Sequence, residues 1–313
     1  MISARSLRID YDNVTAVYDL DLEIPKGQIF GLVGPNGAGK TSTIKALAGI
    51  LEPTYGEIKI AGIDIDLSPQ EALRSLGYMP DFPPVYENLK VGEYLDVFAA
   101  AYLIPRQERS QRIKHWLERV DLLGKQNALI HTLSRGMRQR LVLAKTLLHQ
   151  PTVLFLDEPA SGMDPIARKE LRNILTEVSQ QGTTVLISSH ILTELSDFCT
   201  SVGIMEKGRM VVSGTIEEIR KRVGSKGKLV IRLVNPYERT REALLHDLKN
   251  VPYLHEPNEV APGHFHAYFS GEDNLAANLL KELIAQGHPI ADFHLREENV
   301  EDIFFKIGAR EVS

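Results

Sequence analysis

Hydrophobic and polar residues alternate along the first part of the chain in a pattern that predicts β-strands. The alternation occurs at residues 7–11, 20–24 and 56–65, whereas residues 30–33 are hydrophobic throughout and fit a buried central strand. Further hydrophobic runs at residues 153–156 and 183–188 are each followed by a segment with helical spacing. Strands that alternate with helices predict a parallel sheet with crossover helices.

The middle of the chain has the spacing of helices. Hydrophobic residues recur at helical intervals over residues 92–130, and Pro105 is a break within them. We expect this segment to form the main part of a helical subdomain at about residues 82–150.

A change of composition near residues 224–227 divides the chain. This stretch of Gly, Ser and Lys predicts a linker between a large domain at residues 1–223 and a small α+β domain at residues 224–313. The elements predicted in the small domain are strands at residues 229–234, 264–269 and 290–295, and helices at residues 238–248, 274–286 and 300–307.

Composition narrows the class of protein. The 313 residues are 43% hydrophobic and 25% charged, as in an ordinary soluble protein. The net charge of −5 argues against a general nucleic-acid binder, and the longest hydrophobic stretches, such as residues 97–104, are too short to cross a bilayer. The single cysteine, Cys199, excludes a disulfide framework and a thiolate metal cluster, and it indicates a reducing compartment.

A glycine-rich loop follows the predicted central strand and precedes a helical segment. Loops in this position cradle phosphates with their backbone N–H groups. Lys40 supplies a positive charge near the β- and γ-phosphates, and the Thr41 hydroxyl can bind Mg²⁺. The candidate nucleotide-binding residues of this loop are Gly34, Pro35, Asn36, Gly37, Ala38, Gly39, Lys40, Thr41 and Ser42.

Acidic residues and a histidine follow the next two predicted strands. Asp157 comes directly after residues 153–156 and is a candidate to hold Mg²⁺ through water. Glu158 is next, and strand alternation predicts that it points the other way, where it can act as general base on a water molecule. His190 closes the following strand, where it can bind the γ-phosphate and orient that water.

A second anion-binding device lies at residues 133–140, Leu-Ser-Arg-Gly-Met-Arg-Gln-Arg. A Ser-x-Gly turn here opens a basic helix. The start of a helix offers free backbone N–H groups and the positive end of the helix dipole. One nucleotide site needs only one such device, so the second requires an explanation.

Taken together, these motifs resemble the nucleotide-binding subunit of ABC transporters over residues 2–223. The resemblance implies an α/β fold, a P-loop NTPase core with a mostly parallel sheet, an antiparallel β subdomain and a helical subdomain. It identifies residues 34–41 as the Walker A loop, Asp157 as the Walker B aspartate, Glu158 as the catalytic glutamate and His190 as the switch histidine.

The resemblance assigns roles to three further motifs. Tyr11, at the end of a predicted strand, would stack on adenine, although the sequence alone equally allows a packing role. Residues 161–164 resemble the D-loop, with Asp164 as its acidic residue. The signature motif at residues 133–139 would bind the nucleotide held by another copy, through Ser134, Arg135, Gly136 and Met137.

The resemblance also implies partners and cofactors. In ABC proteins two domains pack head to tail, and each ATP lies between the Walker A loop of one and the signature of the other. A chain with one motif set would therefore form a homodimer. Mg²⁺ would be held by Thr41, Asp157 and, as a further candidate, Asp81. A membrane permease would dock on residues 82–89, which would place the protein on the cytoplasmic face of the plasma membrane.

Three positions depart from the commonest family pattern. Asp81 stands in place of a glutamine that approaches Mg²⁺ and the attacking water. Arg135 and Met137 replace a glycine and a glutamine in the signature. These departures resemble the exporter-type branch with ABC-2 permeases, as does the sequence at residues 298–306. The C-terminal domain could be regulatory, could support the dimer or could be an inert appendage.

Two other classes of function fit parts of this pattern. One is a soluble ABC ATPase that acts on nucleic acid or ribosomes. The single motif set, the acidic balance and the lack of a zinc module or long basic arms argue against it. The other is a non-hydrolysing ATP switch, which the presence of Glu158 and His190 disfavours. The sequence therefore predicts an ATPase that powers an exporter and has no nucleic-acid partner.

Overall fold

The computed structural model divides the chain into two compact units, Met1–Ile216 and Glu217–Ser313. It describes residues 1–82, 84–191, 194–195, 198–223, 227–234, 236–271 and 273–296. The expected linker residues 224–226 and the expected helix at residues 300–307 lie outside the described residues. The domain boundary between residues 223 and 224 stays a prediction.

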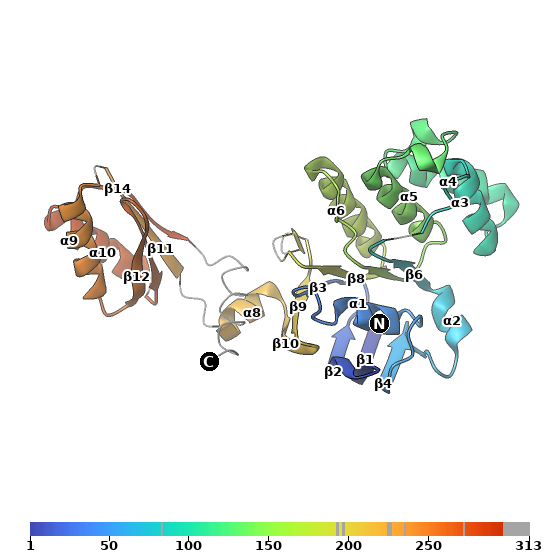
Figure 1. Ribbon diagram of the computed structural model, residues 1–313, viewed down its shortest axis with the longest axis horizontal. Helices are drawn as coiled ribbons and strands as arrows, with labels where there is room; N and C mark the ends of the chain where they lie inside the picture. Colours follow the sequence, from blue (N-terminus) through green and yellow to red (C-terminus); the bar gives the residue numbers. More distant parts are fainter. Residues whose placement is uncertain are drawn as a thin grey trace. The chain divides into compact units, whose positions relative to one another are not determined.

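A six-stranded, mostly parallel sheet forms the centre of the first unit (Figure 1). Its strands run in the order β10 (Arg209–Gly214), β9 (Ser201–Glu206), β3 (Ile29–Val33), β8 (Thr184–Ser189), β7 (Val153–Leu156) and β6 (Leu76–Met79). β3 lies parallel to β8 and β9, whereas β10 is antiparallel to β9. Every residue of β3, β7 and β8 is buried, as expected of hydrophobic central strands. The loops after these three strands therefore meet at one edge of the sheet.

An antiparallel sheet covers one side of this central sheet. It consists of β2 (Val14–Ile24), β1 (Ile2–Tyr11), β4 (Tyr55–Ile60) and β5 (Ile63–Asp64). Helix α1 (Lys40–Leu47) lies between the two sheets (Figure 1). One hydrophobic core joins the three layers, because Leu7 of β1, Ile44 of α1 and Phe155 of β7 are all fully buried within it.

Helices cover the other side of the central sheet (Figure 1). α3 (Val91–Ala101), α4 (Arg106–Arg119) and α5 (Arg135–Leu147) pack against one another and form the helical subdomain, while α6 (Pro165–Gln180) packs on β3 and β8. Pro105 separates α3 from α4, as the sequence predicted. Helix α2 (Pro69–Arg74) precedes β6, and 3₁₀ turns at Leu123–Lys125 and Ile130–Thr132 lead from α4 to α5.

The second unit is an antiparallel sheet with helices on one face (Figure 1). Its strand order is β12 (Leu254–Ala261), β13 (His264–Phe269), β11 (Gly227–Leu233) and β14 (Ile290–Arg296). α9 (Glu238–Lys249) and α10 (Asp273–Ala285) bury Leu244 and Leu279 against Ile231 and Phe265 of the sheet. α8 (Ile216–Val223) joins the two units along the chain.

The structure divides one predicted strand and contains further elements that the sequence analysis did not predict. The strand expected at residues 56–65 is two strands, because Ala61 and Gly62 form a turn with φ angles of 56° and 83°. The hairpin of β9 and β10 was not predicted. Neither was β12, because its sequence, Leu-His-Glu-Pro-Asn-Glu-Val-Ala, has no regular hydrophobic alternation and contains Pro257. The strand is irregular at Glu256, which has a left-handed φ of 50°.

Candidate active site

The glycine-rich loop lies between the end of β3 and the start of α1. Two of its glycines have no room for a side chain, because a Cβ atom would lie 2.3 Å from the Met205 carbonyl oxygen at Gly34 and 2.5 Å from the Ala16 carbonyl oxygen at Gly39. Gly39 also has a left-handed φ of 100°. No side chain caps α1, and its first turn contains no acidic residue. The N–H groups of that turn are thus available to an anion.

The turn between β9 and β10 is hydrogen-bonded to this loop. Gly208 donates its N–H to the Ala38 carbonyl oxygen at 3.1 Å, and its own carbonyl accepts from the N–H of Tyr18 at 2.7 Å. Two features favour glycine at position 208. Its φ is 79°, and a Cβ atom there would lie 2.7 Å from the Ala16 carbonyl oxygen. The phosphate loop, β2 and this turn are therefore hydrogen-bonded as one assembly.

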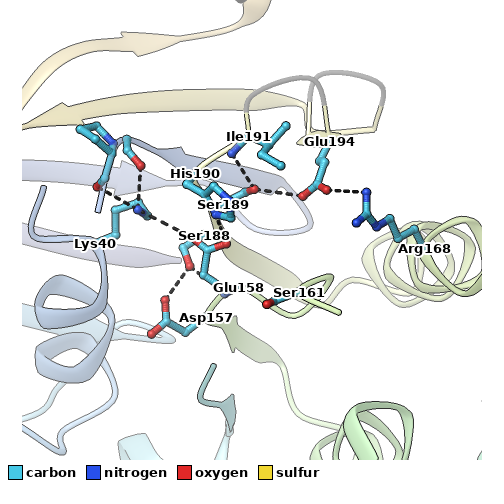
Figure 2. Close-up of polar contacts among 12 residues, drawn as sticks. Lys40, Asp157, Glu158, Ser161, Arg168, Ser188, Ser189, His190, Ile191 and Glu194 are labelled. Carbon is cyan, nitrogen blue, oxygen red and sulfur yellow. Dashed lines mark hydrogen bonds and ion pairs between the residues drawn. The ribbon is translucent and has the colours of Figure 1, made fainter. Parts of the chain in front are cut away.

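Lys40 is buried within the loop, with only 6% of its surface exposed. Its ammonium donates to the carbonyl oxygens of Gly34 at 2.7 Å and Pro35 at 3.2 Å, and lies 3.6 Å from Glu158 Oε1 (Figure 2). Burial lowers the pKa of Lys40, while the charges of Glu158 and Asp157 act in the opposite direction. This positive charge is held at the place where the loop would surround phosphates.

The first turn of α1 and the end of β1 bring Tyr11 beside the loop. The Tyr11 hydroxyl donates to Ser42 Oγ at 3.3 Å. The tyrosine is 43% exposed, so its ring is not packed into the core. Thr41 and Ser42 follow Lys40 in the same turn. Stacking of Tyr11 on adenine stays a prediction.

Asp157 follows β7 and is almost completely buried. Its Oδ1 atom accepts from Ser188 Oγ at 2.6 Å (Figure 2), and its N–H donates to the Met79 carbonyl oxygen at 2.9 Å. Ser188 Oγ also accepts from the Glu158 N–H at 2.9 Å. Ser188 thus holds both acidic residues from the neighbouring strand, a role that sequence reasoning missed. Its position in the Ser-Ser-His run was the available signal.

Glu158 reaches its position through a turn, because β7 ends at Leu156 and the expected strand alternation does not extend to it. Its φ of 48° is left-handed, which is uncommon for glutamate. Its Oε2 atom lies 2.9 Å from His190 Nδ1, and its Oε1 atom faces Lys40 (Figure 2). The turn therefore aims this carboxylate at both a histidine and the phosphate loop.

Asp81 comes two residues after the end of β6. Its Oδ1 atom is buried and has no hydrogen-bond partner among the described residues. Burial raises the pKa of the Asp81 carboxyl, and the charges of Asp157 and Glu158 raise it further, whereas Arg135 and His190 oppose the rise. Asp81 thus places an acceptor oxygen that has no hydrogen-bond partner among the described residues near both acidic and basic side chains.

The signature residues open α5. Ser134 is the N-cap of that helix, and its Oγ atom accepts from the Met137 N–H at 3.3 Å. Arg135 is directed within its own subunit: Nη2 donates to Ser161 Oγ at 3.2 Å, and Cζ lies 5.0 Å from the centroid of the Phe82 ring. A Cβ atom at Gly136 would lie 3.6 Å from the Gly162 carbonyl oxygen, so the signature adjoins the D-loop of the same chain.

Asp164 caps the helix that follows the D-loop. Its Oδ1 atom accepts from the N–H groups of Ile166 at 3.0 Å and Ala167 at 2.9 Å. The bond from Ala167 is the largest of the causes that lower the pKa of Asp164. The expected D-loop acid thus fixes the start of α6.

A second support, missed by sequence reasoning, links α6 to the segment after His190. Glu194 Oε2 accepts from Ser189 Oγ at 3.1 Å, and Glu194 Oε1 lies 2.8 Å from Arg168 of α6 (Figure 2). Ser189 Oγ also accepts from the Ile191 N–H at 3.0 Å. These contacts fix the backbone on both sides of His190.

This donor set fits Mg²⁺ and a nucleoside triphosphate. Among the described residues, no three acidic, histidine or cysteine side chains form a metal cage. Mg²⁺ does not require one, because it usually takes one or two carboxylates and completes its shell with phosphates and water. Asp157 and Asp81, whose Oδ1 atom has no hydrogen-bond partner within the described part of the chain, would supply such carboxylates near the Lys40 loop.

The fold and the site define a nucleotide-binding α/β protein, and comparisons identify its family. A family model described as "ABC transporter" matches residues 17–161. YcbN of Bacillus subtilis (strain 168), an uncharacterized ABC transporter ATP-binding protein, is 31% identical over 98% of this chain and 96% of its own. The probable multidrug ABC transporter ATP-binding protein YbhF of Escherichia coli (strain K12) is 34% identical over 70% of this chain. The chain belongs to the family of ABC transporter ATP-binding proteins.

Solved structures agree on the fold. An ATP-binding subunit of an ABC transporter is 31% identical, with a TM-score of 0.68, over 72% of this chain and 93% of that one. The bacterial ABC transporter cassette MJ0796, whose structure is dimeric, has a TM-score of 0.64 at 21% identity over 69% of this chain and 99% of that one. The predicted P-loop NTPase core is thus confirmed.

The relatives differ in length. The match covers 38% of YbhF, so this chain spans well under half of that protein. Among the residues described here, no helix has the length and apolar character needed to span a bilayer.

Proposed function

We propose that this protein hydrolyses ATP as a homodimer and thereby powers an ABC-2 type membrane exporter. The observation that carries the proposal is the contact of one carboxylate, Glu158, with both the phosphate-loop lysine Lys40 and the strand-end histidine His190. A general base must lie within hydrogen-bond reach of the proton that it takes. Glu158 Oε2 lies 2.9 Å from His190 Nδ1, and Glu158 Oε1 lies 3.6 Å from the Lys40 ammonium, so the carboxylate is placed between the phosphate loop and the histidine.

Phosphate binding would begin with rearrangement around Lys40. Its ammonium contacts two loop carbonyls and Glu158, and incoming phosphate oxygens offer a stronger, charge-assisted partner. The exchange would release Glu158 to accept a proton from the attacking water. His190, 2.9 Å from Glu158, would orient that water and contact the γ-phosphate.

Thr41, Asp157 and Asp81 are the residues that would hold Mg²⁺. When bound, the metal supplies positive charge to the phosphate oxygens. Ser188 would keep Asp157 in place by its 2.6 Å hydrogen bond.

The second half of each site would come from the partner copy. Within this chain the signature lies beside its own D-loop. The N–H groups at the start of α5 and the hydroxyl of Ser134 would bind the γ-phosphate held by the other subunit's loop. The dimeric structure of the MJ0796 cassette supports this arrangement.

The expected permease surface follows Asp81. Phe82 and Tyr86 are 72% and 58% exposed, while Val85 and Leu89 are half-buried. The Tyr86 ring lies 6.2 Å from that of Phe98 on α3, so the surface continues onto the helical subdomain. Such exposed aromatic surface is typical of interaction sites. Docking there would hold the protein on the cytoplasmic face of the plasma membrane. A role in transport agrees with the name of YbhF, a probable multidrug ABC transporter ATP-binding protein.

Sedimentation of the Glu158→Gln variant with and without Mg-ATP tests the dimer and the sandwiched nucleotide. We expect a monomer without ATP and a dimer with it, because ATP binds the interface and cannot be hydrolysed. A monomer under both conditions would contradict the proposal.

Co-purification separates transport from the alternative of an ABC ATPase acting on nucleic acid or ribosomes. The full chain, expressed in its native cells and extracted with detergent, should carry a multi-helix membrane protein. Substitution of Tyr86 by Glu should abolish this association and leave the isolated ATPase active. Recovery of ribosomes or nucleic acid instead would favour the alternative.

A further inference from the structure

Arg135 occupies a position that the helix itself disfavours. It is the first residue of α5, and the first turn of that helix contains no acidic residue. The N-terminus of a helix carries partial positive charge, so a guanidinium there is repelled unless other groups hold it. The contacts of Arg135 therefore indicate what its side chain is for.

Those contacts lie in two other segments of the same subunit. The guanidinium carbon lies 5.0 Å from the centroid of the Phe82 ring, within cation–π range, and Nη2 donates to Ser161 Oγ at 3.2 Å. The absence of a side chain at Gly162 leaves room for the Arg135 guanidinium, because a Cβ at this position would lie 3.1 Å from Arg135 Nε. Its φ of 75° also favours glycine.

Both segments lead directly to groups of the candidate active site. Phe82 follows Asp81, whose buried Oδ1 atom has no partner among the described residues. The Ser161 N–H donates to the Glu158 carbonyl oxygen at 3.1 Å, so the D-loop turn is closed on the catalytic glutamate. Arg135 thus links the signature helix to side chains of the two segments that flank the site.

We propose that Arg135 is a positioning residue for hydrolysis, which holds the Asp81 segment and the D-loop in register with the signature helix of its own subunit. This inference rests on the proposed ATPase function. It places the arginine side chain in cis, while the backbone N–H groups of the signature remain for the partner's nucleotide. Because Phe82 is 72% exposed, contact of a membrane partner with its ring would act on the same guanidinium.

Steady-state ATPase kinetics of the full chain test the proposal, with Arg135→Gly as the main variant. We expect kcat to fall about tenfold with KM for ATP within about twofold, because misplacement of reacting groups affects the rate more than binding. The Tm should stay near that of the wild type, since loss of the contacts is offset by relief of the repulsion at the helix start. Arg135→Lys, which keeps the charge over Phe82, should have an intermediate kcat.

Arg106→Gly is the matched control, because Arg106 is likewise the first residue of its helix, α4, and lies on the surface. It should retain wild-type kcat. A kcat of Arg135→Gly equal to that of the wild type or of Arg106→Gly overturns the inference. Absence of ATP hydrolysis by the wild-type protein would instead overturn the proposed function.

Phe82→Leu tests this link without altering the arginine. If Arg135 acts through the ring, the double variant Phe82→Leu, Arg135→Gly should have the kcat of Arg135→Gly alone. Multiplication of the two single effects would show that the residues act independently and would overturn the role assigned to Arg135. If Arg135→Gly proves unstable, the single variant Phe82→Leu decides the question instead, because it removes the ring contact and leaves Arg135 unchanged.

Discussion

At the scale of single residues, Asp81 is a position at which we predicted a departure from the commonest family pattern. Its Oδ1 atom is buried without a partner among the described residues, and burial together with Asp157 and Glu158 raises the pKa of its carboxyl. A neutral amide avoids the cost of burying a charge there and still presents an oxygen.

Asp81→Gln should therefore retain ATPase activity. The measurement is basal turnover at saturating Mg-ATP, and we expect it to stay within about tenfold of the wild type. Glu158→Gln, which removes the proposed general base, is the control that should abolish turnover. Total loss of activity in Asp81→Gln would mean that a negative charge is required at this position.

Two glycines of the phosphate loop allow the cost of a left-handed backbone to be measured separately from the cost of a steric clash. Gly37 and Gly39 have left-handed φ angles of 82° and 100°. A Cβ at Gly37 would have nothing within 4 Å, whereas one at Gly39 would lie 2.5 Å from the Ala16 carbonyl oxygen.

Gly37→Ala should cost about 1–2 kcal/mol of stability, the cost of a left-handed alanine. Gly39→Ala should cost clearly more, because the backbone of β2 must also move. Chemical denaturation of both variants without nucleotide measures the difference. Equal losses of stability in the two variants would show that the close contact with the Ala16 carbonyl oxygen is relieved without a further loss of folding free energy.

At the scale of elements, the capping of α6 by Asp164 makes a prediction about pH. The backbone N–H bonds lower the folded-state pKa of this carboxyl below its ordinary value of 3.8. The ionised form is therefore the one that stabilises the fold. This contribution is present above pH 3.8 and is lost as the pH falls through the lower folded-state value.

Asp164→Ala should accordingly lower the Tm at pH 7, and the deficit should shrink as the pH falls below about 4. Thermal unfolding of the wild type and the variant across this range is the measurement. Asp164→Asn keeps a capping oxygen without the charge and should lose less at pH 7. A deficit independent of pH would contradict the assigned capping role of the carboxylate.

The elements also show what a sequence can and cannot predict here. The sequence was enough to predict that Lys40, Asp157 and His190 lie close together, because they follow buried parallel strands whose ends share one sheet edge. The direction of the Glu158 side chain could not be predicted from the sequence, since it depends on a left-handed turn and not on strand alternation. The contacts of Ser188, Glu194 and Arg135 depend on tertiary packing and left no periodic signal.

At the scale of the whole molecule, the two compact units have separate hydrophobic cores. Phe155 and Ile44 belong to the first, and Leu244 and Phe265 to the second. The candidate nucleotide site lies in the first unit, so ligand should stabilise the two units differently.

Calorimetry of the Glu158→Gln protein should therefore show two transitions, with Mg-ATP raising only one. At 100 times the Kd the gain is about 2.7 kcal/mol. Leu244→Ala, at a fully buried position, should cost about 2–5 kcal/mol and lower only the other transition. A single transition that both changes shift would show that the units unfold together.

The hydrogen bond between Gly208 and the phosphate loop has a mechanical consequence. From Gly208 the chain continues along β10 and enters α8, where the second unit begins. A single strand therefore connects the C-terminal unit to the turn that supports the nucleotide loop. We therefore expect a pull on that unit to reach, along β10, the turn whose Gly208 donates a hydrogen bond to Ala38 in the candidate phosphate loop.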